Sequence, residues 1–368
     1  MKYIVKTTSP LNSCEWINSP SKKALVLMSG GVDSSAAALL LMKENYTLAG
    51  MTMEIAPSGS SSAGLSASSV CKELSIPHFS VNIREEFNEN VIIPFCTSYS
   101  RGVTPNPCAD CNEKIKFGVL WEAAEELLGN DFSVATGHYA RIIKKEGRHY
   151  LAKGANKAKD QSYFLSGIPA KKIPRILFPL GDFRSKEETR ELVRAFGLAV
   201  SERPESMEIC FANEEGYRAM ISGDQNPGPI MDTSGKVLGD HKGIGGYTLG
   251  QRKGLGIASK HPLFVISIVP ETNTVVVASR AEAFRSEVTA GSVNMLTPEY
   301  MKEGLILFGK IRSQGEPVPC RILYVGNDCL SVRFSEPVFA PAPGQRLVIH
   351  TEEGYVAAGG VIKDSPID

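Results

Sequence analysis

The sequence lacks a hydrophobic run long enough to cross a membrane, and its first residues lack the apolar core of a secretion signal. It also lacks a charge excess, because 40 Lys and Arg residues balance 40 Asp and Glu residues. The net charge of the chain therefore does not attract nucleic acid, although a local basic face can still bind it. These absences predict a cytoplasmic protein with no membrane partner.

Eight cysteines in 368 residues, without an export signal, favour thiols or metal ligands over a disulfide framework. Apolar residues at 42% and charged residues at 22% are typical of a globular chain. The length exceeds what one hydrophobic core usually serves, so we expect two or three domains.

Short β-rich runs alternate with helical runs between residues 23 and 138. The expected strands are 23–28, 48–55, 78–83 and 132–136, and the expected helices are 34–44, 67–74 and 111–128. This alternation predicts an α/β domain with a parallel sheet covered on both faces, and ligands at the carboxyl ends of its strands.

The pattern changes after about residue 211, where Gly and Pro crowd the chain and the helical period is lost. Residues 262–269 and 274–279 flank a turn-like PETN and predict a hairpin, and several short strands follow at the spacing of a small barrel. The predicted division is a leader (1–22), an α/β domain (23–211), a β-rich connector (212–280) and a C-terminal β-barrel (281–368).

The run ALVLMSGGVDSSAAALLL places a glycine pair and several hydroxyl and carboxyl groups where a strand passes into a helix. Backbone N–H groups and the helix dipole favour an anion there, and glycine lets a phosphate approach closely. The run is not the lysine-containing NTPase loop, because no GK[ST] follows. Ser29 and Asp33 as simple helix caps are the alternative. The predicted phosphate-binding residues are Leu27, Met28, Ser29, Gly30, Gly31, Val32, Asp33, Ser34 and Ser35.

Two cysteines, Cys108 and Cys111, lie at CxxC spacing where prolines precede a helix, and Cys210 follows much later. A helix N-terminus predicts a lowered thiol pKa for Cys111. Three thiolates suit an iron-sulfur cluster with one open iron, or a pair that handles sulfur while the third assists. An inert CxxC with an unrelated buried Cys210 is the third interpretation.

Six motifs together resemble the bacterial and organellar tRNA-specific 2-thiouridylase family (MnmA/TrmU), over about residues 23–350. They are LMSGGVDSS, TPNPCADCNEKIKFG, ATGHYAR, KDQSYFL, ESMEICF and YTLGQRKGLGI. The resemblance implies an adenine-nucleotide α-hydrolase-like domain of the PP-loop ATP pyrophosphatase type, a small connector and a β-barrel. It also implies ATP-dependent replacement of the 2-oxo group of the tRNA wobble uridine with sulfur.

The resemblance further implies site residues and cofactors. ATP and Mg²⁺ would bind at the phosphate loop, with Met53 and Gly137 near the nucleoside. The target base, out of its stack, would lie against Asn106, Pro107 and Cys108. Further expected tRNA contacts are Lys159, Asp160, Gln161, Arg252 and Arg312. After Arg312 the sequence departs from the family, because Ser313 and Gln314 replace the Tyr-Arg pair that relatives often carry after KIR.

Two routes for sulfur remain open. In many relatives Asp stands at the position of Cys108, Cys210 carries a persulfide and Cys111 resolves it. The three-cysteine pattern instead looks like enzymes that hold a 4Fe-4S cluster on Cys108, Cys111 and Cys210, and we favour this cluster. The sulfur donor would be a cysteine desulfurase, a sulfur-relay protein or hydrosulfide.

Two functions of other classes are weighed against this one. A small-molecule ATP pyrophosphatase, of the amidotransferase-like ligases, would explain SGGVDSS but leaves TPNPCADC and GQRKGLG without a role. A non-catalytic RNA-binding iron-sulfur protein is disfavoured by the intact Asp33 and Ser34.

Overall fold

The computed structural model describes residues 3–7, 16, 19–55, 62–202, 209–211, 220–221, 226–326 and 328–363. It forms two compact units. The first contains Met1–Asn90, Ala109–Glu205 and Gly354–Val356, and the second contains Val91–Cys108, Ser206–Glu353 and Ala357–Asp368. The segment from Val91 to Cys108 therefore belongs with the later part of the chain, although the α/β region surrounds it in sequence.

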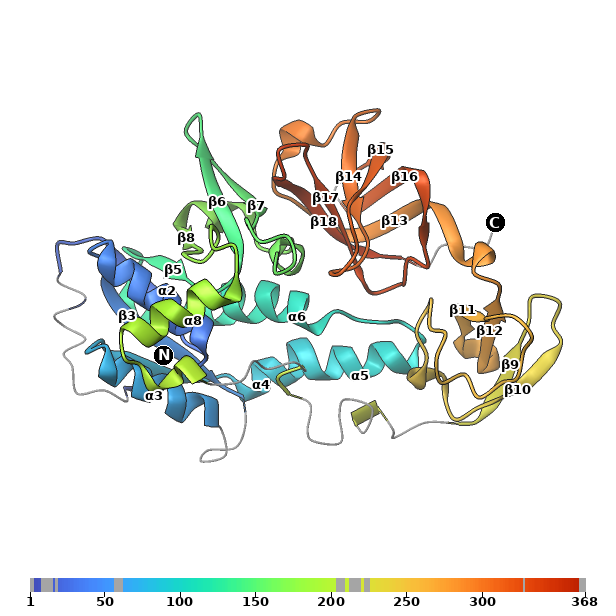
Figure 1. Ribbon diagram of the computed structural model, residues 1–368, viewed down its shortest axis with the longest axis horizontal. Helices are drawn as coiled ribbons and strands as arrows, with labels where there is room; N and C mark the ends of the chain where they lie inside the picture. Colours follow the sequence, from blue (N-terminus) through green and yellow to red (C-terminus); the bar gives the residue numbers. More distant parts are fainter. Residues whose placement is uncertain are drawn as a thin grey trace. The chain divides into compact units, whose positions relative to one another are not determined.

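A six-stranded sheet forms the centre of the first unit, in the order β1-β4-β3-β2-β5-β8. Figure 1 labels its strands β3, β5 and β8. All neighbours run parallel except β1, which pairs antiparallel with β4 at the edge. The bounds are β1 Ile4–Thr7, β2 Lys23–Leu27, β3 Thr47–Glu54, β4 His78–Asn82, β5 Ser133–Ala135 and β8 Ile176–Leu177. The predicted parallel sheet is confirmed, and β1 is a strand that the sequence analysis missed.

Three helices cover one face of this sheet, and the opposite face is buried as well. Helices α2 (Val32–Lys43), α3 (Ser62–Glu73) and α8 (Lys186–Ala195) share one apolar cluster with Ala24 and Val26 of β2. Leu25 points to the opposite face because side chains alternate along a strand, and it is equally buried.

A continuous helical stretch carries the CxxC motif. It consists of α6 (Pro107–Asp110), the π-helical η2 (Cys111–Val119) and α7 (Leu120–Leu128). The predicted helix 111–128 is thus confirmed, but it begins four residues earlier, with proline at its first position. Cys108 lies in the first turn and Cys111 one turn later. Cys111 is therefore the fifth residue of this helical stretch and not its first.

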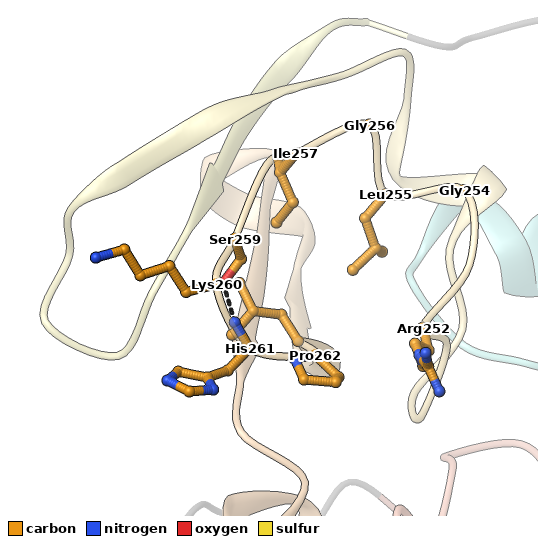
Figure 2. Close-up of a pocket in the computed structure, with 10 residues that line it drawn as sticks. Arg252, Gly254, Leu255, Gly256, Ile257, Ser259, Lys260, His261 and Pro262 are labelled. Atoms are coloured by element: carbon orange, nitrogen blue, oxygen red, sulfur yellow. Dashed lines mark hydrogen bonds between the residues drawn. The ribbon is translucent and has the colours of Figure 1, made fainter.

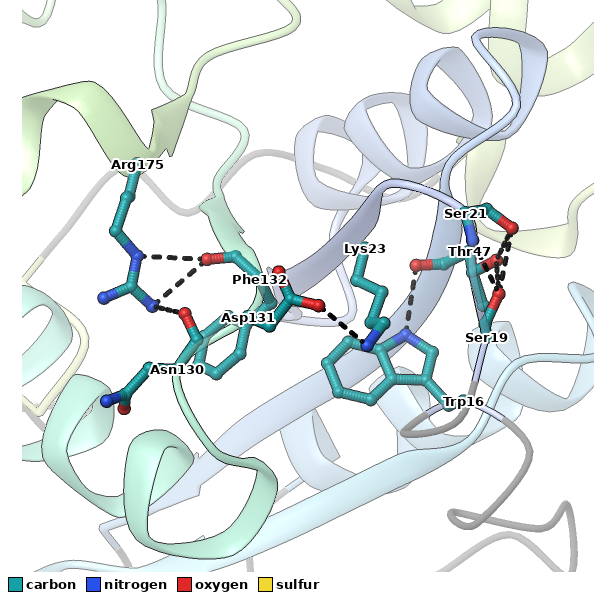
Figure 3. A network of polar contacts seen from close by, with 9 residues as sticks. All are labelled: Trp16, Ser19, Ser21, Lys23, Thr47, Asn130, Asp131, Phe132 and Arg175. Carbon is teal, nitrogen blue, oxygen red and sulfur yellow. Dashed lines mark hydrogen bonds and ion pairs between the residues drawn. The ribbon is translucent and has the colours of Figure 1, made fainter.

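The amino ends of three strands are held by Trp16, which precedes β2, and by Lys23, the first residue of β2. The Trp16 indole donates to Thr47 O at 3.0 Å, and its ring centroid lies 6.0 Å from that of Phe132. Lys23 pairs with Asp131 at 3.1 Å, as Figure 3 shows. These contacts hold the end of the sheet opposite to the one where β2 enters α2.

The remaining elements of the first unit are short, and so is α5, which belongs to the second unit. They are α4 Arg84–Phe87, η1 Asn88–Ile92, α5 Ile93–Ser100, β6 Ala140–Lys145, β7 Arg148–Lys153, η3 Ser162–Leu165, η4 Ala170–Arg175 and η5 Ala199–Glu202.

The second unit contains two all-β parts. A four-stranded sheet has the order β10-β9-β12-β11, and six further strands close into a barrel in the order β13-β16-β15-β14-β17-β18. The sheet strands are β9 Gly228–Met231, β10 Val237–His241, β11 Phe264–Val269 and β12 Thr274–Ala278. The barrel strands are β13 Phe284–Met295, β14 Ile306–Lys310, β15 Val318–Val325, β16 Cys329–Phe339, β17 Arg346–His350 and β18 Val356–Ile362.

The predicted hairpin is confirmed as the antiparallel pair β11 and β12, and the predicted barrel is confirmed as a closed one. The predicted α/β fold with a β-rich connector and a β-barrel is therefore the observed architecture. In the part of the chain that the structure describes, no helix has the length and apolar character needed to span a bilayer.

Candidate nucleotide and sulfur-transfer site

The phosphate loop lies at the carboxyl end of β2. The strand ends at Leu27, and α2 begins at Val32 with Gly31 as its extended N-cap. Gly30 has a φ of 71°, in the left-handed region that glycine adopts without steric cost. No side chain caps α2, so the interpretation of Ser29 and Asp33 as simple caps is wrong. The first N–H groups of α2 are directed at this edge of the sheet, as an anion site requires.

Three serines fix the shape of the loop. The Ser29 hydroxyl accepts from Gly31 N at 3.3 Å and lies 3.2 Å from the Ser34 hydroxyl. Ser34 and Ser35 donate to Gly31 O at 3.2 and 2.9 Å. The loop is thereby held in one conformation by its own side chains.

Asp33 is held by side chains from two distant segments. Lys186 Nζ lies 2.5 Å from Asp33 Oδ1, and the Tyr139 hydroxyl donates to the same oxygen at 3.1 Å. The Tyr139 hydroxyl also lies 2.7 Å from that of Thr189, which is fully buried. The sequence analysis missed Lys186, Tyr139 and Thr189. The capping-box spacing from Ser185 to Glu188 would have placed a helix start at Lys186, but nothing local points to Asp33.

Buried polar groups support the loop from beneath. Thr52 donates to Met28 O at 2.8 Å and lies 2.9 Å from His78 Nε2. Burial lowers the pKa of His78 to about 4, against a smaller opposing effect of Glu54. His78 is therefore neutral at physiological pH and donates from Nε2 to Thr52.

The two residues expected near the nucleoside, Gly137 and Met53, lie on different segments of the first unit. Gly137 follows β5 and lies so close to the loop that an added Cβ would stand 2.6 Å from the Asp33 carbonyl carbon. Met53 is half-buried near the carboxyl end of β3. Beside Gly137, burial and then Lys116 lower the pKa of His138 well below its usual range.

The expected tRNA-contact segment 159–161 is anchored to the same cluster. Gln161 Oε1 accepts from Tyr139 N, and Gln161 N donates to Tyr139 O, both at 2.9 Å. Asp160 Oδ1 accepts from Gly154 N at 3.0 Å and from Ser162 N at 3.1 Å. Lys159 is exposed. Asp160 and Gln161 thus shape this segment, whereas Lys159 lies at the surface.

The CxxC helix contacts the segment that follows. Cys111 is buried, and the next residue, Asn112, donates from Nδ2 to Phe164 O at 3.1 Å. Asn112 Oδ1 is buried with no hydrogen-bond partner among the described residues. π-Helical turns of this kind are frequent at functional sites.

In the second unit, α5 positions the segment around Cys210. The Phe211 ring packs edge-on against Phe95 at 5.4 Å, and Ile209 and Ile221 join the same cluster. Cys210 itself is exposed, which contradicts the interpretation of a buried, unrelated Cys210. Residues 205–208 of its motif lie outside the described residues.

The loop that leads to Cys108 is fixed by Gln345. Its Nε2 donates to Thr104 O at 3.1 Å and to Pro105 O at 3.0 Å, and its Oε1 accepts from Asn106 at 3.3 Å. Asn106 and Pro107 are buried and Cys108 is exposed. Gln345 lies some 240 residues away in sequence, so local reasoning could not find it.

Four exposed basic residues gather on the connector. We call residues 252–263 the basic loop; it contains Arg252, Lys253, Lys260 and His261 and no Asp or Glu. Figure 2 shows the pocket of ≈ 400 Å³ that this loop lines. Arg312 differs, because its guanidinium donates to Leu249 O at 3.1 Å and Ala340 O at 2.7 Å.

Among the described residues, no group of three or more His, Cys, Asp or Glu side chains is arranged to hold a metal ion. The three cysteines of the predicted cluster are all among the described residues. The cluster therefore has no support from this structure.

Three family models match the chain. Residues 22–214 match the tRNA methyl transferase HUP domain, residues 221–279 the tRNA methyl transferase PRC-barrel domain, and residues 285–362 the aminomethyltransferase beta-barrel domain.

Curated relatives match over nearly the whole length. The tRNA-specific 2-thiouridylase MnmA 1 of Syntrophus aciditrophicus is 41% identical, over 94% of this chain and 93% of that protein. The tRNA-specific 2-thiouridylases MnmA of Carboxydothermus hydrogenoformans and Clostridioides difficile are each 39% identical, over 93% and 94% of this chain and 98% and 99% of their own. The phosphate loop, the CxxC helix and these full-length matches agree: the chain belongs to the tRNA-specific 2-thiouridylase family.

Proposed function

We propose that this protein converts the wobble uridine of tRNA to 2-thiouridine, using ATP to activate the base and a cysteine persulfide to supply sulfur. The observation that carries the proposal is the phosphate loop at the carboxyl end of β2, with Asp33 held by Lys186 and Tyr139, in a chain of this family. The substrate is inferred from the family, and the first chemical step is inferred from the phosphate loop.

The first step makes the uridine oxygen a leaving group. Uridine O2 attacks the α-phosphorus of ATP, the bond to the bridging oxygen breaks, and its electron pair leaves with pyrophosphate. The N–H groups at the start of α2 and the glycine pair bind the phosphates and stabilise the charge that develops on them. Met53 and Gly137 are proposed to lie near the nucleoside.

Asp33 suits the Mg²⁺ that accompanies ATP. A carboxylate at the phosphate loop is the oxygen ligand that Mg²⁺ prefers, and 36% of the Asp33 side chain is exposed. When bound, the ion neutralises charge on the departing pyrophosphate. The hydrogen bonds among the loop serines would help to orient the phosphates.

The second step transfers sulfur. The terminal sulfur of a persulfide on Cys210 attacks C2 of the adenylated uridine, and AMP leaves with the oxygen. Cys111 then attacks the Cys210 sulfur, which breaks the S–S bond to the base, releases 2-thiouridine and leaves a Cys111–Cys210 disulfide. A thiol reductant must reduce this disulfide before the next turnover.

The exposed Cys210 suits a residue that must accept sulfur from a donor. The donor is proposed to be a cysteine desulfurase or a sulfur-relay protein. The alternative is a 4Fe-4S cluster on Cys108, Cys111 and Cys210 with hydrosulfide as donor, and no step is derived through it.

The cysteine variants decide between these routes. In the persulfide route, Cys111→Ala and Cys210→Ala abolish thiolation while pyrophosphate release persists, and Cys108→Ala stays near full activity. In the cluster route, all three variants lose activity, and anaerobically purified protein contains iron and sulfide. Cys108→Asp is the matched control, because it recreates the acidic residue of many relatives.

The substrate contacts follow from exposure and charge. The base is proposed to lie against Asn106, Pro107 and Cys108, in the loop that Gln345 holds. Lys159 and the basic loop with Arg252 are proposed to bind phosphates of the tRNA backbone. Asp160, Gln161 and Arg312 are proposed to act through the segments that they hold in place.

The test is pyrophosphate release measured with the sulfur donor omitted. The proposal expects release that requires tRNA and stops near one equivalent per enzyme, because adenylated tRNA accumulates. Release that is equally fast without tRNA would instead support a small-molecule ATP pyrophosphatase, and no release with any tRNA would support a non-catalytic RNA-binding protein.

A further inference from the structure

We propose that Lys186 binds the β- and γ-phosphates of ATP. Without nucleotide, Lys186 pairs with Asp33, and it leaves this ion pair when ATP binds. This inference rests on the proposed function, since it assigns a new residue to the same phosphate site. Lys186 lies on α8, which runs alongside α2 in the first unit (Figure 1).

The position of Lys186 is electrostatically unfavourable for a structural lysine. It is the first residue of α8, directly after the N-cap Ser185. A helix N-terminus carries partial positive charge, so an ammonium group there is repelled rather than stabilised. Only 16% of the side chain is exposed, which reduces its contact with water as well. In the structure the Asp33 carboxylate offsets this cost, and the phosphates of ATP would offset it once Lys186 moves.

The phosphate loop provides that anion site and lacks a lysine of its own. Residues 27–35 contain no Lys or Arg, unlike the NTPase loop in which lysine contacts the phosphates. The ammonium of Lys186 lies 2.5 Å from Asp33 Oδ1, in the first turn of the helix that receives the phosphates. Lysine has a long flexible stem, so a small change of rotamer moves its charge from the carboxylate to a neighbouring phosphate oxygen.

Asp33 does not lose all its partners when Lys186 moves. The Tyr139 hydroxyl continues to donate to Asp33, and Thr189 on the next turn of α8 fixes that hydroxyl. The carboxylate is then positioned for the Mg²⁺ that ATP brings. As the bond to the α-phosphorus breaks, the electron pair goes to pyrophosphate, and the Lys186 charge stabilises it.

The experiment compares the affinities of the full-length protein for ATP and for AMP, with Mg²⁺ present and tRNA absent. Lys186→Met removes the charge and keeps the length of the side chain, and Lys186→Arg keeps the charge. Lys72→Met, on the exposed last turn of α3, is the control for a lysine away from the loop. Calorimetry gives the two dissociation constants, and thermal melting without nucleotide checks the fold.

We expect Lys186→Met to weaken ATP about 10- to 100-fold and AMP less than about twofold, because AMP lacks the two phosphates that Lys186 would contact. Lys186→Arg should restore most of the ATP affinity. Should Lys186→Met fail to fold, Lys186→Gln, which can still donate to Asp33, carries the same comparison.

Two results would overturn the assignment of Lys186. Equal losses for ATP and AMP would show a purely structural residue, and unchanged ATP affinity would show that the ion pair does not open. Both are distinct from failure of the proposed function, in which the unmodified protein itself binds no ATP or releases no pyrophosphate with tRNA.

Discussion

The phosphate loop of the first unit and the basic loop of the second both gather groups that attract anions, but they are built differently. At the phosphate loop the charges are partly buried and paired, and Asp33 contacts side chains from two distant segments. In the basic loop the charges are exposed, and two of its glycines, Gly254 and Gly256, have positive φ.

This difference separates two ways of binding phosphate. A preorganised site with few solvent contacts selects one ligand in one geometry, and each of its parts has a large effect. An exposed basic surface binds many phosphates weakly, and its contribution falls with salt. The first suits ATP and the second suits the backbone of tRNA.

The largest expected effect is that of Asp33→Ala. Removal of the carboxylate should reduce tRNA-dependent pyrophosphate release about 1,000-fold, because the residue that positions Mg²⁺ at the loop is lost. Initial rates at saturating ATP measure this loss. Asp131→Ala, which removes the exposed partner of Lys23, is the matched control, and equal rates for the two variants would remove Asp33 from the mechanism.

Acid should weaken the first unit through two histidines whose pKa is lowered, His78 and His138. The pKa of His78 is about 4 in the folded protein against about 6.5 unfolded, so stability is complete above pH 6.5 and falls as the pH drops toward 4. His78 accounts for at most about 3 kcal/mol, and His138 acts in the same direction. Urea unfolding at several pH values measures this slope. An unchanged slope in His78→Gln would contradict the assignment.

Alanine substitutions should have different effects on ATP affinity at the tightly packed Gly137 and at the open Gly246. In Gly137→Ala the new Cβ would meet the backbone of Asp33, which must shift, so we expect a loss of ATP affinity of about 100-fold. Gly246→Ala in the connector meets nothing within 4 Å and should be neutral. Comparable ATP affinities for the two variants would mean that the phosphate loop tolerates displacement.

The smallest expected effect is that of charge reversal in the basic loop. Arg252→Glu combined with Lys260→Glu should weaken tRNA binding about 10-fold at low salt and flatten its salt dependence, while ATP affinity stays unchanged. Lys159→Glu should act in the same direction. Filter binding across a salt titration measures both quantities, and an unaltered salt slope would rule out this surface.

Local sequence signals predicted most of the elements around the site. Hydrophobic strands and glycine at a strand end are local properties, so β2, the phosphate loop and α2 could be placed before the fold was known. The antiparallel edge strand β1 was missed, because a four-residue strand with one half-buried residue carries little pattern. The predicted domain boundaries stay predictions.

The partners of the site residues could not be predicted in the same way. Lys186 is 153 residues from Asp33, and Gln345 is 239 residues from Asn106. Such pairs depend on how the whole sheet and barrel are assembled, and neither lysine nor glutamine is unusual in its local context. The sequence placed Cys108, Cys111 and Cys210 in a cluster because three thiols suit one, whereas the described structure groups no such set.

The central claim is that this protein uses the cleavage of ATP to replace an oxygen of a tRNA uridine with sulfur. The most direct measurement is the nucleoside mass spectrum of tRNA after incubation with the protein, ATP, Mg²⁺ and a persulfide donor. The account predicts that the wobble uridine gains the mass of an oxygen-to-sulfur exchange, with one pyrophosphate released for each thiolated nucleoside. Pyrophosphate released with every tRNA uridine still unmodified would contradict it.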